Sequence, residues 1–263
     1  MCLILLAYRI HPAYELLVAA NRDEFHDRPT APLAFWDDQP QVLAGRDLQA
    51  GGTWMGITRA GRFAALTNYR DPQHVRPGAP SRGQLVSAYL QGGEPASAYL
   101  EKLLPRAAAY NGFNLLLGDE TGLYYYSNYA DGWRPLPPGI HGLSNHLLDT
   151  PWPKLARGRR ALRQALEQTV EPQPDALLAI LTDRPPAPDA ELPATGVPSE
   201  WERWLPPIFI DARGYGTRSS TILMVGHDGR TRMIETTWAD AGRREFELAW
   251  PKGNRDARVV PAP

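Results

Sequence analysis

The chain has 263 residues, of which 43% are hydrophobic, and a formal net charge of −1. This length suits one large domain or two modest ones, and the balanced charge argues against a nucleic-acid partner. Cys2 is the single cysteine, which excludes a disulfide within the chain. No apolar stretch approaches the roughly 20 residues that span a bilayer, and no basic start precedes a cleavage site. The sequence therefore predicts a cytoplasmic protein without a transmembrane segment.

The first half of the chain reads as strands followed by helices. Two apolar runs joined at His11-Pro12 predict an opening hairpin, and a charged, proline-containing segment after it predicts a loop. The predicted elements, in order, are strands 3–9 and 14–20, the loop 22–40, strands 53–58 and 62–68, helices 82–90 and 95–110, and strands 113–118 and 122–128.

The second half returns from helices to strands. The predicted elements are a helix over 154–169 with a basic outer face, a helix over 175–183, a proline-rich loop over 183–207, and strands 219–226, 231–238 and 244–250. Because an isolated hairpin is only marginally stable, we expect the hairpins from the two ends of the chain to pair with each other. This predicts a layered α+β fold with antiparallel sheets, in a single domain over 1–263.

Cys2 directly follows the initiator methionine. Removal of Met1 would place a thiol and a free α-amine on the same residue, and an amine with a pKa of roughly 7.7–8.0 can accept the thiol proton near neutral pH. A small buried cysteine near a chain terminus is the alternative interpretation.

The segment after the second strand, Asn21-Arg22-Asp23-Glu24, combines an amide, a guanidinium and two carboxylates. An arginine beside a thiol favours the thiolate, and a carboxylate beside the α-amine would orient it. A charged loop with a surface salt bridge is the alternative. Adjacent residues on a continuous strand face opposite sides. Either the strand ends by Asn21, therefore, or only one of Arg22 and Asp23 reaches the thiol.

Three further polar residues are candidates for the same site. Asn68 ends an apolar strand in the segment LTNYR, Asn145 lies in GLSNH, and Arg218 follows a glycine-containing turn in YGTRSSTIL. An amide aimed at a developing oxyanion can contribute about 2.7–4 kcal/mol to catalysis, and an arginine can bind a carboxylate. A turn-closing asparagine and a cross-strand ion pair are the alternatives. The stretch 43–57, with Arg46 and the pair Gly51-Gly52, is interpreted as a wall of the pocket.

Together these segments resemble the NRDE family, known in animals as the transport and Golgi organisation protein 2 family. The resemblance rests on the Met-Cys start, the tetrad at 21–24, GGTW at 51–54, LTNYR, GLSN and YGTRSSTIL, and it covers nearly the whole chain. That family is similar to the N-terminal-nucleophile (Ntn) hydrolases of the choloylglycine hydrolase and penicillin acylase type. The resemblance implies a four-layer αββα sandwich.

The resemblance also implies roles for individual residues. Cys2 matches the nucleophile, Arg22 and Asp23 the groups that tune the thiol and the amine, Asn68 and Asn145 the amides around the oxyanion, and Arg218 the late arginine. This sequence has His146 and Leu147 where that branch commonly has serine and proline. Around the catalytic set we expect substrate-binding side chains at Asn21, Arg46, Trp54, Tyr69 and His146.

Two functions follow from the resemblance. One is an amidohydrolase or thioesterase that acts on a small acyl amide or thioester through Cys2 and needs no cofactor. The other is a carrier of haem, acyl-CoA or lipid, with haem as the candidate transported ligand. The histidines lack the spacing of a metal site, so no metal ligand is assigned. A homo-oligomer is compatible with the composition.

Overall fold

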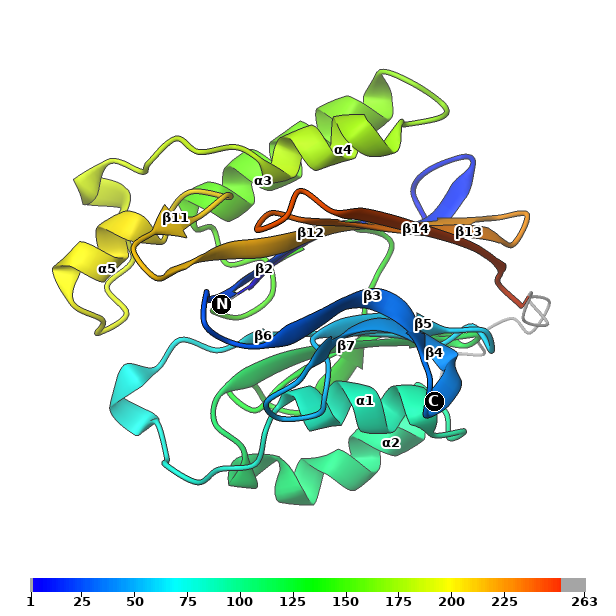
Figure 1. Cartoon of the computed structure of the whole chain (residues 1–263), viewed down its shortest axis with the longest axis horizontal. Helices are drawn as coiled ribbons and strands as arrows, with labels where there is room; N and C mark the ends of the chain where they lie inside the picture. Colours follow the sequence, from blue (N-terminus) through cyan, green and yellow to red (C-terminus); the bar gives the residue numbers. More distant parts are fainter. Residues whose placement is uncertain (1, 252–263) are drawn as a thin grey trace, which may run out of the picture.

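Two antiparallel β-sheets lie face to face, with helices on the outer side of each (Figure 1). The computed structural model describes residues 2–251, so Met1 and the last 12 positions of the predicted domain lie outside the described residues. The α+β class, the antiparallel sheets and the four-layer αββα arrangement are confirmed. In the described part of the chain, no helix is long and apolar enough to cross a membrane.

The first sheet contains the first and the last strand of the described residues. Its strand order is β10-β1-β2-β12-β13-β14, with the short β11 paired to β12. β2 pairs with β12 along almost its whole length, which confirms the prediction that the terminal hairpins meet. The strands are β1 (Cys2–Tyr8), β2 (Tyr14–Phe25), β10 (Gly139–Leu143), β11 (Asp211–Ala212), β12 (Tyr215–Gly226), β13 (Arg230–Thr237) and β14 (Arg243–Ala249).

The second sheet is built from the middle of the chain in sequential order, β3-β4-β5-β6-β7-β8-β9. Its strands are β3 (Thr30–Trp36), β4 (Gln39–Asp47), β5 (Met55–Thr58), β6 (Phe63–Asn68), β7 (Phe113–Asp119), β8 (Gly122–Ser127) and β9 (Trp133–Pro135). The loop predicted over 22–40 is wrong. β2 continues to Phe25, and β3 forms an edge strand of the second sheet. Pro32 has no backbone N–H to donate, and an edge strand tolerates this because one of its sides has no neighbouring strand. The strands β4, β9, β10 and β11 were also absent from the prediction.

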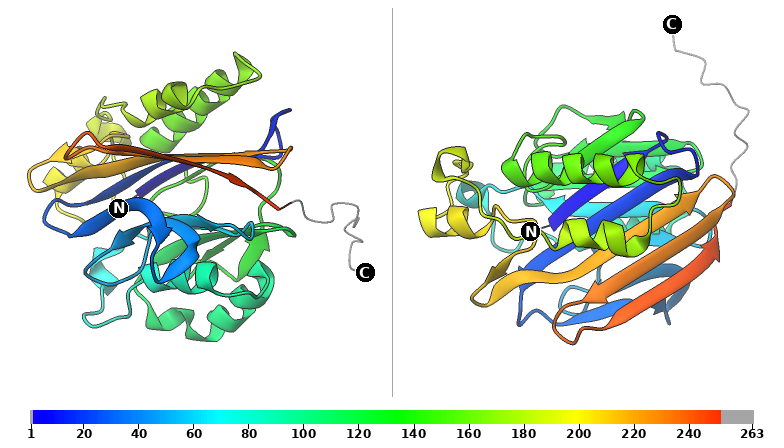
Figure 2. Two further views of the ribbon diagram at one scale, coloured as in Figure 1. Left: turned by 45° about the vertical axis from the view of Figure 1, so that its right-hand side comes forward. Right: turned by 90° about the horizontal axis from the view of Figure 1, so that it is seen from above.

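The helices cover the outer faces of the two sheets (Figures 1 and 2). The cover of the second sheet is α1 (Gly83–Gln91), α2 (Ala96–Leu103) and the 3-10 turn η2 (Leu104–Ala109), and that of the first is α3 (Pro153–Glu167) and α4 (Pro174–Leu181). The remaining short helices are the 3-10 turns η1 (Pro72–His74) and η3 (Asp189–Glu191) and the α-helix α5 (Ser199–Trp204), of which the last two interrupt the predicted loop 183–207.

Alternation along the strands divides the core into layers. In β1, Ile4 and Leu6 pack between the sheets, whereas Leu3 and Leu5 pack beneath the helices α3 and α4. Successive side chains of a strand point to opposite faces, so a residue's parity determines which layer it enters. For the site residues of β1 and β2, this rule determines which side of the first sheet each side chain faces.

Candidate active site at the amino terminus of β1

Cys2 is the first residue of β1 and faces the space between the two sheets. Its partner across the strand pair is Arg22 of β2, and directly opposite residues in an antiparallel pair point to the same side. Ile4 shares the parity of Cys2 and belongs to the core between the sheets. The thiol therefore lies where that core meets the end of the sandwich, although Cys2 as a whole residue is partly exposed.

A cavity of about 440 Å³ opens at this end of the sandwich. It is lined by groups from both sheets and from the start of α1, among them Cys2, Arg22, Asp23, Trp54, Asn68 and Arg82. Four of these were predicted as catalytic residues and Trp54 as a substrate-binding residue. The fold thus brings five sequence-predicted residues, from segments far apart in the chain, to one cavity.

The surroundings of the thiol favour its protonated form. Burial raises the pKa of Cys2, and the carboxylate of Asp23 acts in the same direction. The amino-terminal charge, the positive charge of Arg22 and a backbone hydrogen bond from Asp23 lower the pKa, in that order of strength, but are weaker than the effect of burial. A neutral thiol is a poor nucleophile, so covalent chemistry at Cys2 requires a base within reach.

Arg22 separates the thiol cavity from a second one. Its side chain is 5% exposed, its guanidinium lies 4.4 Å from the centre of the Trp54 ring, and its Nη1 has no hydrogen-bond partner among residues 2–251. Arg22 and Trp54 also line a cavity of about 250 Å³ between the sheets, together with Arg218 and the buried Glu235. The stacked pair is therefore the common wall of the two cavities.

The tetrad at 21–24 is strand, which decides between the two alternatives for Arg22 and Asp23. Arg22 faces the thiol side, whereas Asn21 and Asp23 face the helices. Asp23 is 1% exposed and accepts a 2.7 Å hydrogen bond from Thr217 Oγ1. It nevertheless reaches the edge of the cavity because β1 begins at Cys2, opposite Arg22, so Asp23 lies beyond the last pair that the described residues of β1 and β2 form.

Asn21 lies outside the cavity. Its Nδ2 donates to the carbonyls of Leu181 and Ile208, both at 2.9 Å, and its Oδ1 accepts from Ser220 Oγ at 2.6 Å. These bonds attach the helical layer to the centre of the first sheet. Asn21 was predicted to bind substrate, and the structure places its amide entirely among protein groups.

The two predicted oxyanion amides have different positions. Asn68 ends β6 and lines the thiol cavity. Asn145 is fully buried, does not line that cavity, and donates through Nδ2 to the backbone carbonyl of Asn68 at 3.0 Å. Ser144, which the sequence did not single out, donates to the carbonyl of Cys2 at 3.1 Å. Ser144 and Asn145 thus connect the first residue of β1 to the end of β6.

Arg218 occupies an irregularity in the strand pairing. The register between β12 and β2 shifts between Thr217 and Ser219, so Arg218 is the extra residue of a β-bulge. Its Nη1 donates to the carbonyls of Phe25 and Arg28 at 2.7 and 3.2 Å, and its side chain lines the second cavity rather than the thiol cavity. Arg218 therefore holds the turn between β2 and β3 in place.

The other predicted substrate-binding residues do not line either cavity. Arg46 forms a two-bond ion pair with Asp38 at 2.6 and 2.8 Å. The Tyr69 ring stacks on Tyr129 at 4.0 Å, and the His146 ring lies 5.0 Å from Tyr69. All three residues are half-buried and are held by other protein groups outside the two cavities.

The GGTW segment places Trp54 through two backbone requirements. Gly51 has a φ of +75°, a conformation that side chains disfavour. A Cβ on Gly52 would lie 2.5 Å from the backbone carbon of Gly83. The backbone segments at Gly52 and Gly83 therefore approach each other more closely than a residue with a side chain at position 52 would permit. The predicted pocket wall is therefore present, and it brings Trp54 to the start of α1.

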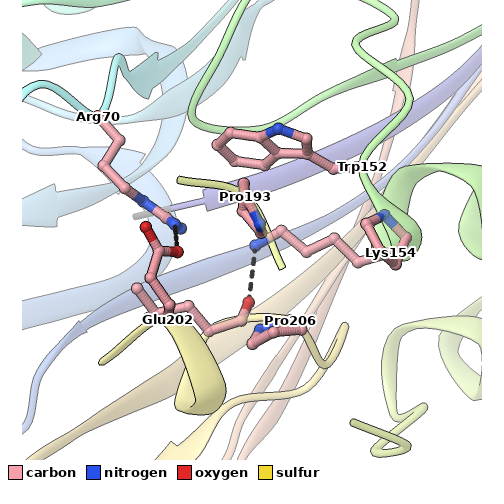
Figure 3. A pocket seen from close by; sticks show the side chains of 8 residues that line it. Arg70, Trp152, Lys154, Pro193, Glu202 and Pro206 are labelled. Atoms are coloured by element: carbon pink, nitrogen blue, oxygen red, sulfur yellow. Dashed lines mark hydrogen bonds and ion pairs between the residues drawn. The ribbon is translucent and has the colours of Figure 1, made fainter. Parts of the chain in front are cut away.

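Sequence reasoning missed a set of buried charges behind the thiol. Arg70 forms an ion pair with Glu202 at 3.1 Å, and Trp152 covers the arginine at 4.9 Å (Figure 3). Lys154 is only 2% exposed, although the pattern 154–169 placed it on a basic outer face. Arg70 adjoins the LTNYR asparagine, which is a usable signal, but nothing in the local sequence distinguishes Lys154 from a surface lysine.

Comparisons with known proteins agree with this architecture. The family model for Transport and Golgi organisation 2 matches residues 1–240. The mouse Transport and Golgi organization 2 homolog is 35% identical over 94% of this chain and 96% of its own length, and the bovine homolog is 38% identical over the same shares. Among solved structures, the C2A variant of a conjugated bile acid hydrolase from Clostridium perfringens superposes with a TM-score of 0.52, at 8% identity, over 94% of this chain and 92% of that one.

The structural likeness confirms the predicted Ntn-hydrolase-like fold, and the sequence match confirms the predicted family. The chain belongs to the Transport and Golgi organisation 2 family, and it has the fold of the Ntn hydrolases.

Proposed function

We propose that this chain is a cysteine hydrolase that cleaves small acyl amides or thioesters, with Cys2 as an N-terminal nucleophile after removal of Met1. The observation that carries the proposal is the position of Cys2: it is the first residue of a central strand, opposite Arg22, in the wall of a 440 Å³ cavity. A thiol in this position meets the carbonyl group of a substrate bound in the cavity. The α-amine belongs to the same residue as the sulfur, so it is close enough to accept the thiol proton.

The proposed reaction needs only groups of this chain and water. The α-amine of Cys2 takes the thiol proton, the sulfur attacks the carbonyl carbon, and the amine or thiol of the substrate leaves with that proton. This produces a thioester on Cys2. Water then attacks the thioester, gives a proton to the α-amine, and releases the carboxylic acid, after which the proton returns to sulfur. The raised pKa of the thiol makes this base necessary.

We assign the oxyanion contact to Asn68 and a positioning function to Asn145. Asn68 lines the cavity, whereas the Asn145 amide is directed at the Asn68 carbonyl. A donor fixed in advance near the reacting oxygen stabilises the charge that develops there without reorganisation during the reaction. Asn145 acts through the geometry of Asn68 and of Ser144, which holds the Cys2 carbonyl.

The carrier hypothesis is the alternative, in which the same cavity holds haem, acyl-CoA or a lipid without covalent chemistry. The cavity size accommodates part of such a ligand, and Arg22, Arg28 and Arg82 provide positive charge at its wall. The hydrolase proposal is favoured because the carrier hypothesis gives no reason for a thiol at the first position of β1.

Acylation of Cys2 tests the proposal. The purified protein is incubated with a chromogenic short-chain acyl thioester and with the matching anilide, and intact mass and product release are followed together. We expect a mass lacking one methionine, one acyl group per chain, a burst, and then steady turnover.

Because Cys2 is the single thiol, loss of labelling in Cys2→Ala alone does not separate catalysis from simple thiol reactivity. The decisive control is the same chain unfolded in urea, which should acylate at least about 100-fold more slowly. Retained Met1, or equal rates in the folded and unfolded chains, would reject the hydrolase. The next measurements would then be titrations with haem and acyl-CoA.

A further inference from the structure

A buried lysine lies at the start of α3, behind the thiol site. Lys154 is 2% exposed, and its Nζ donates to the backbone carbonyl of Leu205 at 3.3 Å (Figure 3). Burial lowers the pKa of this ammonium to about 8. The first turn of a helix is also the unfavourable end of its dipole for a cation. A charge in such a position needs a compensating anion nearby.

The packing of α3 places Lys154 toward the Cys2 end of β1. Gly158 backs onto Leu5 so closely that a Cβ would lie 2.7 Å from the leucine side chain. Lys154 precedes Gly158 by one helical turn, which is about 6 Å along the helix axis. The same distance along β1 corresponds to about two residues, so Lys154 lies about two strand residues from the level of Leu5. Asp23 faces the same layer from the neighbouring strand, near the end where β1 begins.

One short segment of chain connects the two groups. At its start, the carbonyl of Leu205 accepts the hydrogen bond from Lys154. At its end, the N–H of Ile210 donates to Thr217 Oγ1 at 2.9 Å, and that hydroxyl donates to Asp23 at 2.7 Å. The ammonium and the carboxyl group are therefore held on the same scaffold beneath α3.

Electrostatics couple the two groups in both directions. Burial raises the pKa of Asp23, and among side chains Lys154 opposes this most strongly. The carboxylate of Asp23 is likewise the strongest neighbouring charge that raises the pKa of Lys154. The other titratable groups around the pair are Cys2 of β1, the amino-terminal charge, Arg22 of β2, Arg70 after β6, Arg157 of α3, Tyr215 of β12 and Glu202 of α5, which lines the same small pocket as Lys154.

We propose that Lys154 is a positioning residue of the nucleophile: its ammonium keeps the buried Asp23 carboxyl group ionised, so that Asp23 can hold the α-ammonium of Cys2 that carries the thiol proton. Lys154 itself contacts no substrate and transfers no proton. This inference rests on the proposed function, because the α-amine is free only when Met1 has been removed.

Titration of Asp23 tests the electrostatic part without requiring turnover. Protein labelled with ¹³C in its aspartate carboxyl groups is titrated by NMR, and the Asp23 signal is assigned by its loss in Asp23→Asn. In Lys154→Met we expect the Asp23 midpoint to rise by at least about 1 pH unit, since a nearby opposite charge typically shifts a carboxyl group by 1–3 units.

Two variants keep the test decisive. Lys154→Arg retains the charge and should leave the midpoint within about 0.3 unit of wild type, as should the exposed control Lys102→Met, because neither removes the buried cation. If Lys154→Met does not fold, Lys154→Gln, which can still donate to the Leu205 carbonyl, replaces it. An unshifted Asp23 midpoint in the folded neutral variant overturns the proposal.

The pH profile of kcat/KM tests the positioning part. The acidic limb should move upward in Lys154→Met by the same amount as the NMR midpoint and return in Lys154→Arg. A uniform loss of rate without movement of the limb would mark a purely structural role and overturn the proposal. If the wild-type protein shows no turnover, the proposed function fails, while the NMR titration still decides the Lys154–Asp23 coupling.

Discussion

Replacement of Asn21 by leucine separates a structural from a substrate-binding role for the first residue of the tetrad. The leucine has a similar volume but none of the hydrogen bonds that Asn21 makes to Leu181, Ile208 and Ser220. The two carbonyls and the hydroxyl would remain buried, because the Asn21 position itself is 1% exposed.

The expected cost follows from these three bonds. Leaving a buried polar partner unsatisfied costs about 1–3 kcal/mol each, and Ser220 keeps a second contact with Trp238, so we expect a loss of about 4 kcal/mol. Such a loss is a large part of the roughly 5–15 kcal/mol by which a domain is usually stable.

Urea unfolding followed by circular dichroism measures this loss from the midpoint and the slope. The exposed Gln168→Leu at the end of α3 is the control and should change stability by less than about 0.5 kcal/mol. A loss below about 1 kcal/mol in Asn21→Leu would refute the structural reasoning. If the variant has wild-type stability but a tenfold lower kcat/KM, the result would instead support the predicted substrate-binding role of Asn21.

Three further outcomes are expected. Asn68→Ala should lower kcat by about 100-fold or more, because it removes the oxyanion donor, and Asn145→Ala should lower kcat less. A larger loss of kcat in Asn145→Ala than in Asn68→Ala would assign the oxyanion contact to Asn145 instead. Gly45→Ala should displace the Trp54 ring, since its Cβ would lie 2.4 Å from that ring, and should change tryptophan fluorescence, whereas Gly93→Ala, which meets no atom within 4 Å, should not. Burial raises the pKa of Glu235, so its contribution to stability is present in acid and declines as pH rises through the folded pKa. Glu235→Gln should remove that decline in unfolding measurements between pH 4 and pH 8, and an unchanged slope would contradict the shift.

Local patterns in the sequence determined much of this protein. Apolar runs bounded by turns located β1, β7, β8 and the closing strands, and the helical spacing located α3 and α4. The marginal stability of isolated hairpins was sufficient to predict that the two ends of the chain pair. The position of Cys2, with Arg22, Asp23 and Asn68, identified the candidate site because these residues lie at or beside the ends of the predicted strands, although the structure places Arg22 and Asp23 within β2.

Tertiary structure decided which of those side chains meet. Strand parity and the bulge at Arg218 direct that residue to the second cavity, and a 77-residue separation hides the bond between Asn145 and Asn68. β3 was missed because its proline, Pro32, is tolerated only at a sheet edge, and edge position is a property of the whole sheet. The local sequence around Lys154 indicates only a surface lysine on a helix with a basic outer face. Only the packing of α3 on β1 buries it beside Asp23, because burial and electrostatic pairing depend on contacts between distant segments rather than on neighbouring residues.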